Sequence, residues 1–167
     1  GTTDTIVTNE DNWTVSTEGP VKSESHYNGE RYDEQTAEKY EGWTTADYTE
    51  SEDWEKPVVH EPRMNDFSFV VRYDEEASVV KELDVKEALG ESKKGSGSYI
   101  YDMGENVIGV PHITIPADYV DPGSTVTVRY AEILYPDLPE YQEDGLVGTM
   151  MVENLRAALC TDFFIAG

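Results

Sequence analysis

The sequence is poor in basic, cysteine and histidine residues, and each shortage excludes a class of protein. Only 12 Lys and Arg residues stand against 35 Asp and Glu, which gives a formal net charge of −23. No basic stripe interrupts this acidity, so nucleic-acid binding is not expected, because the phosphate backbone would be repelled. A single cysteine, Cys160, excludes an internal disulfide and a thiolate metal cluster. None of the three histidines has zinc-ligand spacing.

Long apolar runs and the common hydrolase motifs are also missing. No run approaches the ~18 apolar residues that a membrane-spanning helix requires, so no membrane partner is expected. No G-x-S-x-G nucleophile elbow occurs. Residues 95–97 (GSG) lack the rest of a phosphate-binding loop and are interpreted as part of a flexible linker. Two carboxylates could form a glycosidase pair, but 35 acidic residues do not single one out.

The sequence does contain many short β-branched and aromatic segments separated by Gly and Pro turns. Their alternation predicts strands over residues 3–8, 12–16, 67–73, 98–102, 107–116, 124–134 and 159–165. Residues 78–89 have mixed periodicity, for which we favour an extended run over a short helix. Residues 135–149 are expected to form an acidic loop. This pattern indicates an all-β protein built of β-sandwich or jelly-roll modules.

A connector is expected at residues 57–66 (PVVHEPRMND), where two prolines and several charges follow one another. It divides the chain into two predicted parts. Residues 1–65 would belong to a first β-sandwich domain, with a carbohydrate-binding module as one interpretation, and residues 66–167 would belong to a second.

The turn at Asn28 carries the strongest candidate binding site. Asn28, Glu30 and Asp33 place hard oxygen ligands close to an Asn-Gly turn, and such ligands suit Ca²⁺. Trp43 could pack nearby and offer a flat face to a sugar ring. The alternative is an ordinary hairpin, in which the Asn-Gly pair makes the turn and the acids face water. The residues alone leave both interpretations open.

Two further groups of residues favour a structural role. Residues 101–109 (YDMGENVIG) are typical of a corner of a β-sandwich, with glycines that permit crowded geometry. Near the end of the chain, Arg156 and Asp162 could form a buried or edge ion pair. We predict no catalytic residue in either group.

Three blocks, in order, resemble the N-terminal β-domains of bacterial α-L-rhamnosidases. The first, from Asp11 to Trp54, is similar to that family's W…GP…Y-[ND]-G-E-x-Y-D…G-W…W signature. The second, residues 101–109, resembles Y-D-F-G-Q-N-x-x-G. The third joins RYAEIL at 129–134 with ENLRAALCTDFF at 153–164 and resembles R-x-A-E-x-L…N-L-R-x-A-x-x-T-D-x-Y. The departures are conservative for packing and lie at Met103, Glu105, Val110 and Phe164.

The resemblance implies a non-catalytic accessory region of an enzyme that acts on rhamnose-containing glycans. In this family the β-sandwich domains precede an (α/α)₆ barrel that holds the catalytic acids, and no part of this chain resembles that barrel. We therefore expect β-sandwiches that are incomplete relative to the family's full domains, an inactive fragment, and a downstream catalytic domain of the same polypeptide as partner. We also expect a periplasmic or secreted location.

The resemblance also implies that calcium and rhamnose are candidate ligands. Some family members bind rhamnose through Ca²⁺ in the first of these domains, and the matching turn here runs from Asn28 to Asp33. Two other functions compete with the accessory role. One is an independent carbohydrate-binding module with Ca²⁺-dependent sugar binding, and the other is an enzyme whose carboxylate pair lies within this chain.

Overall fold

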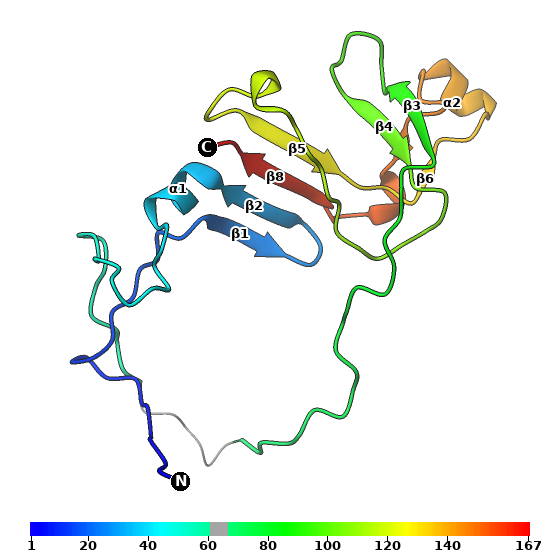
Figure 1. Ribbon diagram of the computed structural model, residues 1–167. Coiled ribbons are helices and arrows are strands. Elements are labelled where there is room, and N and C mark those ends of the chain that lie inside the picture. The colour runs from blue at the N-terminus through cyan, green and yellow to red at the C-terminus, as the bar shows by residue number, and fades with distance from the viewer. Residues whose placement is uncertain (61–66) are drawn as a thin grey trace.

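Short strands dominate the computed structural model, which describes residues 1–60 and 67–167 (Figure 1). The strands are β1 (Val21–Ser25), β2 (Gly29–Asp33), β3 (Glu87–Glu91), β4 (Tyr99–Asp102), β5 (Thr125–Arg129), β6 (Ile133–Leu134), β7 (Met150–Met151) and β8 (Thr161–Ile165). The helical elements are α1 (Glu34–Lys39), α2 (Pro139–Glu143) and the 3₁₀ turns η2 (Ala117–Tyr119) and η3 (Glu153–Leu155). Few and short helices beside several small sheets confirm the predicted all-β class.

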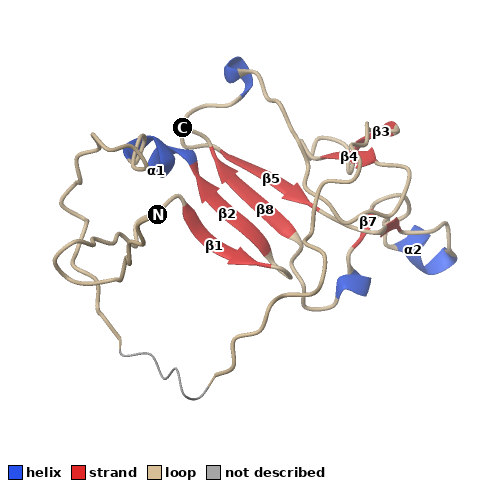
Figure 2. Cartoon of the chain, turned by 60° about the horizontal axis from the view of Figure 1, so that its bottom comes forward, coloured by secondary structure: helices blue, strands red, loops and turns tan. Residues whose placement is uncertain are grey.

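The largest sheet has the strand order β1-β2-β8-β5 and forms a single layer in both ribbon views (Figures 1 and 2). Strands β1 and β2 are antiparallel and are joined by the Asn28-Gly29 turn that the sequence predicts. Strand β8 lies parallel to β2 and antiparallel to β5. A strand near the end of the chain therefore lies between one from its beginning and one from its middle.

Side chains on both faces reinforce the parallel β2–β8 pair. On one face the rings of Tyr32 and Phe164 are stacked, with centroids 6.0 Å apart and planes within 4°. On the other face the Arg31 guanidinium lies 5.9 Å from the centre of the Phe163 ring. The two predicted parts of the chain thus share one sheet. The division predicted at 57–66 stays a prediction, and residues 61–66 lie outside the described residues.

The two remaining sheets are two-stranded. Strands β3 and β4 pair antiparallel with an irregularity between Ala88 and Gly90, and β6 pairs with β7. Helix α2 lies in the sequence between β6 and β7, inside the stretch that we expect to be a loop. Its Tyr141 ring meets the buried Tyr135 ring edge-on at 4.9 Å, and this apolar contact explains why the acidic stretch folds locally.

Outside the β1–β2 hairpin, the N-terminal part is held by an aromatic cluster. The Trp54 ring meets the Tyr40 and Tyr48 rings edge-on, at 6.2 and 6.0 Å. A single bridge pairs Val15 with Glu55. One bridge does not make a strand, so the strand predicted at 12–16 is wrong except for this single pairing at Val15.

Several other strand predictions are wrong for the described residues. Segments 3–8, 67–73 and 107–116 form no strand, and 78–89 is strand only from Glu87 onward. The segment 124–134 splits into β5 and β6. A strand satisfies its amides and carbonyls only by pairing with another strand, and these segments meet no such partner in the described chain.

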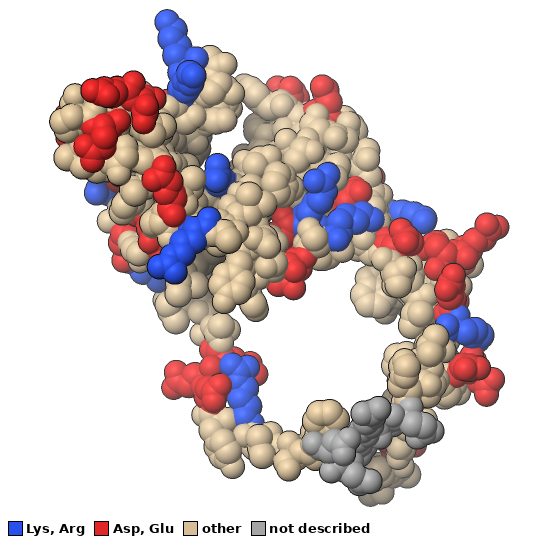
Figure 3. All heavy atoms as spheres, turned by 180° about the vertical axis from the view of Figure 1, so that it is seen from behind, with Lys and Arg blue, Asp and Glu red and all other residues tan. Residues whose placement is uncertain are grey.

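The buried core is small. Among the described residues the buried apolar side chains are Tyr40, Pro57, Ile100, Tyr135 and Ala166. The chain exposes 14566 Å² of surface, whereas a folded monomer of this mass exposes about 8,300 Å². Acidic groups are spread over the face shown in Figure 3 and do not gather in one patch. In the described residues no helix combines the length and apolarity needed to cross a bilayer.

Candidate functional site

Asn28 lies at the tip of the β1–β2 hairpin and contacts the segment that leads into β8. Its side-chain amide oxygen accepts a hydrogen bond from the Leu159 backbone amide at 3.2 Å. Its backbone carbonyl accepts another from the Thr161 amide at 3.1 Å. The oxygen that the sequence proposes as a ligand therefore already has a partner in the protein.

Glu30 and Asp33 lie on opposite faces of β2, because side chains alternate along a strand and these residues are three apart. The Asp33 carboxylate caps α1 by accepting a hydrogen bond from the Thr36 amide at 3.3 Å. Trp43 follows α1 in a loop and is 61% exposed. The side-chain oxygens of Asn28, Glu30 and Asp33 therefore do not converge on one point.

The described residues also contain no group of three or more His, Cys, Asp or Glu that could hold a metal ion. Calcium binding at the turn stays a prediction. As placed here, the donor set does not fit a single ion, since one oxygen is bonded to the backbone and another caps a helix.

Asp162, in β8, is hydrogen-bonded both to β2 and to the residue that follows β5. One oxygen of its carboxylate accepts a hydrogen bond from the Glu30 backbone amide at 2.7 Å, and the other accepts from the Tyr130 hydroxyl at 2.5 Å. Burial, together with the hydrogen bond to Asp162, raises the pKa of Tyr130. The expected Arg156–Asp162 ion pair is wrong, because the ion pairs of the described residues do not include these two side chains.

The hairpin turn fits tightly against β8. Gly29 has φ +92°, and a Cβ added there would lie 2.3 Å from the Thr161 carbonyl oxygen. Only glycine combines this backbone conformation with so close an approach. The Asn-Gly pair thus serves two needs, a left-handed turn and room for the neighbouring strand.

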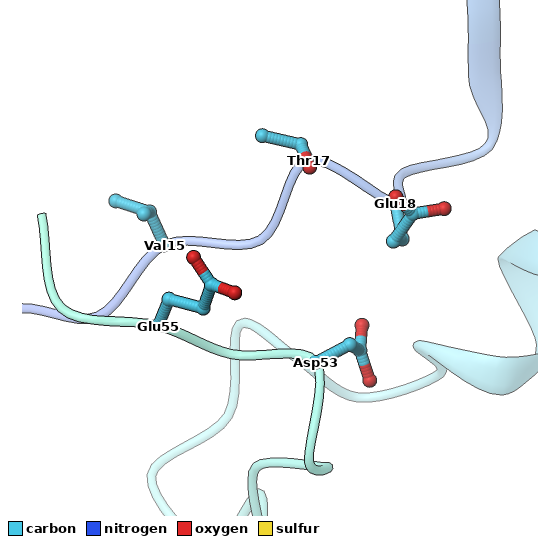
Figure 4. Close-up of a pocket in the computed structure, with 5 residues that line it drawn as sticks. All are labelled: Val15, Thr17, Glu18, Asp53 and Glu55. Carbon is cyan, nitrogen blue, oxygen red and sulfur yellow. The ribbon is translucent and has the colours of Figure 1, made fainter.

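A shallow acidic pocket of about 160 Å³ lies in the N-terminal part (Figure 4). Its lining includes the carboxylates of Glu18, Asp53 and Glu55, drawn as sticks in Figure 4, together with Val15 and Thr17. The acidic lining disfavours anionic ligands and offers acceptors to hydroxyl groups.

Asp53 is the most connected carboxylate of this pocket. It accepts hydrogen bonds from Ser16 at 3.1 Å, from Ser51 at 2.6 Å and from the Tyr40 hydroxyl, and Lys39 lies 3.4 Å away. Desolvation raises the pKa of Asp53, but hydrogen bonds from its own backbone amide, Ser16 and Lys39 outweigh it, and the pKa lies below its usual value. The carboxylate therefore stays ionised and braces the aromatic cluster.

Two family models cover nearly the whole chain. Residues 1–88 match the alpha-L-rhamnosidase N-terminal domain, and residues 92–167 match the bacterial alpha-L-rhamnosidase concanavalin-like domain. Together with the small sheets described above, these matches define the class, which is an N-terminal accessory β region. The chain belongs to the α-L-rhamnosidase family.

Individual relatives agree with the family models. A protein named alpha-L-rhamnosidase from Alteromonas sp. is 31% identical over 160 residues, which cover 96% of this chain and 15% of the relative. Proteins of the same name from Formosa agariphila and Streptomyces avermitilis are 29% and 28% identical, with 96% and 98% of this chain covered. The chain spans about 15% of the length of these relatives. No solved structure matches it significantly.

Proposed function

We propose that this region is a non-catalytic accessory part of an α-L-rhamnosidase that acts on rhamnose-containing glycans. In this proposal it supports a catalytic domain elsewhere in the same polypeptide, called the parent polypeptide below. The observation that carries the proposal is the match of both accessory family models across residues 1–88 and 92–167. The relatives are several times longer than this chain, which leaves ample room for a separate catalytic domain.

The structure suggests how such support would work. The β2–β8 pairing and the Asp162 hydrogen bonds join the two matched parts into one sheet, which gives a continuous scaffold. Rigid scaffolds favour catalysis by holding a neighbouring site in its productive geometry. The accessory region would then affect the stability of the enzyme and the capture of substrate, while the chemical step takes place elsewhere.

An assay with an aryl α-L-rhamnoside tests this proposal. The parent polypeptide should release the aryl group, and residues 1–167 alone should release none above background. Turnover by residues 1–167, abolished by substituting one carboxylate within them, would place the catalytic site in this chain and overturn the proposal. A parent polypeptide that hydrolyses other glycosides but no α-L-rhamnoside would overturn the substrate class.

Two exposed aromatic rings, one in the hairpin turn and one in the loop after α1, favour a second candidate function, which is sugar contact by this region itself. Tyr27 is 74% exposed and Trp43 is 61% exposed, and aromatic faces of this kind stack on pyranose rings. Calorimetric titration of rhamnose, with and without added Ca²⁺, tests this candidate and the predicted calcium dependence together. Heat from rhamnose that is lost in the Trp43→Ala variant would support it, and no heat under either condition would exclude it.

The periplasmic or secreted location belongs to the same proposal. Enzymes that act on large glycans meet them outside the cytoplasm, so the parent polypeptide should be found there. Fractionation of the source cells, with an antibody to this region, tests the location. Recovery in the cytoplasmic fraction alone would contradict it.

A further inference from the structure

Two extended segments of the chain leave their backbone without partners. They are residues 67–73 (FSFVVRY) and 107–115 (VIGVPHITI), and together they are called the open segments here. No backbone–backbone hydrogen bond joins either segment to any other described residue. In Figures 1 and 2 the first of them runs as a lone trace, apart from the four-stranded sheet.

The side chains of the open segments are exposed although they are apolar. Phe69 is 78% exposed, Val70 is 81% exposed and Val110 is 89% exposed. Phe69 and Val70 are neighbours, so both faces of the first segment would present apolar groups to water. Residues 107–115 carry no Asp, Glu, Lys or Arg. An exposed strand with these properties attracts another strand unless something covers it.

The size of the uncovered surface indicates what kind of partner is missing. The chain exposes 14566 Å², about 6,000 Å² more than a folded monomer of its mass. A standard protein–protein contact buries about 800 Å² on each partner. The excess is several times larger, so it corresponds to an uncompleted domain core and not to a docking patch.

We propose that the open segments are strands of sheets completed by strands from the remainder of the parent polypeptide. This inference rests on the proposed function, which supplies that remainder. The relatives support this occupant, because this chain spans only about 15% of their length. A net charge of −23 on each chain opposes a second copy, since two such chains repel one another.

Pro111 selects the edge through which the second open segment pairs. Amide groups of successive residues in a strand point to opposite edges. Pro111 has no N–H, so the edge that carries residues 109, 111 and 113 lacks a donor in its middle. The edge that carries residues 108, 110, 112 and 114 keeps every donor. The partner strand should therefore pair with the latter edge.

Hydrogen exchange in the intact parent polypeptide tests the proposal. Amides of the open segments should exchange at least about tenfold more slowly than those of the loop at residues 93–97, because strand pairing protects them. Within residues 107–115, the amides of Ile108, Val110, His112 and Thr114 should be slower than those of Gly109 and Ile113. Exchange as fast as in the loop would overturn the proposal.

Two further measurements separate this inference from its alternatives. Protection that disappears when the protein is diluted to a monomer, as measured by light scattering, would assign the partner strand to a second copy and overturn the inference. The aryl α-L-rhamnoside assay is run on the same sample. Protected segments in a parent without that activity would overturn the proposed function and leave the strand completion standing.

A matched pair of variants adds a stability readout. Val110→Asp places a charge in an open segment, and Val58→Asp places the same charge at a described valine that is 80% exposed and lies outside both segments. The first should lower the thermal midpoint of the parent polypeptide by several degrees, because a charge would be buried unpaired. The second should change it by less than about one degree. Equal small shifts would contradict burial of Val110.

Discussion

Asp162 and Glu30 are 132 residues apart in the sequence and are joined by a hydrogen bond of 2.7 Å from the Glu30 amide to the Asp162 carboxylate. The same carboxylate accepts from Tyr130, which directly follows β5. Three strands are therefore connected through one side chain. Since β2 lies in the part that matches the N-terminal family model and β8 in the part that matches the concanavalin-like model, the two parts share a structural unit.

The first prediction concerns removal of this carboxylate. Asp162→Ala leaves the Glu30 amide and the Tyr130 hydroxyl without their acceptor, and it should cost about 2–3 kcal/mol. Exchange of the Glu30 amide in the parent polypeptide should rise correspondingly, and urea unfolding should report the lost stability. Asp47→Ala removes an exposed acid from a loop and serves as the control. Equal effects of the two substitutions would show that the Asp162 hydrogen bonds contribute no stability.

The second prediction follows from the raised pKa of Tyr130. Because the folded state holds this proton more tightly than the unfolded state, the associated stability is complete below about pH 10, the ordinary tyrosine pKa, and is lost as the pH rises above it. The free energy of unfolding should fall more steeply between pH 10 and 11.5 in the wild type than in Tyr130→Phe. One fully linked proton changes the free energy of unfolding by at most about 1.4 kcal/mol per pH unit. The contribution of Tyr130 should stay below this limit, since its side chain is partly exposed. If the free energies of unfolding of the wild type and Tyr130→Phe fall in parallel with pH, the pH dependence does not come from Tyr130.

Local signals predicted part of this fold correctly. The Asn28-Gly29 turn, the strand at 98–102 and the strand at 159–165 are all confirmed, because alternation and turn residues lie within a few positions of one another. Segments such as 67–73 carry equally good strand signals. They fail in the described chain because a strand also needs a partner, and no local pattern supplies one.

The candidate site shows the same limit. Residue types alone suggested Asn28, Glu30 and Asp33 as ligands around a turn, but strand alternation and the helix cap at Asp33 separate them. The role of Asp162 depends on the parallel β2–β8 register, which brings together residues 132 positions apart. A Thr-Asp pair within the strand predicted at 159–165 gives no sign of a contact with Glu30.

The third prediction uses two glycines with nearly the same positive φ. Gly29 has φ +92° and Gly90 has φ +90°, so alanine strains both positions similarly. At Gly29 the added methyl would also lie 2.3 Å from the Thr161 carbonyl oxygen, whereas at Gly90 nothing lies within 4 Å. Gly90→Ala should cost about 1 kcal/mol, and Gly29→Ala should cost about 2–3 kcal/mol more, because β2 and β8 must move apart.

Urea unfolding of the parent polypeptide compares the two variants. The difference between them isolates the close approach from the backbone strain that they share. Equal destabilisation would mean that the hairpin relaxes away from β8 without cost, and it would contradict tight packing of the turn against Thr161.

The fourth prediction concerns the acid stability of the aromatic cluster around Trp54. Asp53 accepts hydrogen bonds from Ser16, Ser51 and Tyr40, and its pKa is lowered. A lowered pKa means that the ionised form favours the folded state, so its stabilising effect is present above about pH 4, the ordinary Asp pKa, and is lost as the pH falls through the folded pKa. Asp53→Asn should thus be less stable than the wild type at pH 7, and the gap should close between about pH 4 and 2.

Glu55→Gln provides the matched control for this prediction, because Glu55 lines the same pocket but its side chain accepts none of the Asp53 hydrogen bonds. Thermal unfolding of the parent polypeptide, recorded at pH 7, 5, 4, 3 and 2 for the wild type and both variants, gives the comparison. The Glu55→Gln curve should follow the wild type at every pH. A gap between the wild type and Asp53→Asn that stays constant down to pH 2 would show that the Asp53 charge does not stabilise the fold. In that case the hydroxyl donors around Asp53 bond an amide as well as they bond a carboxylate.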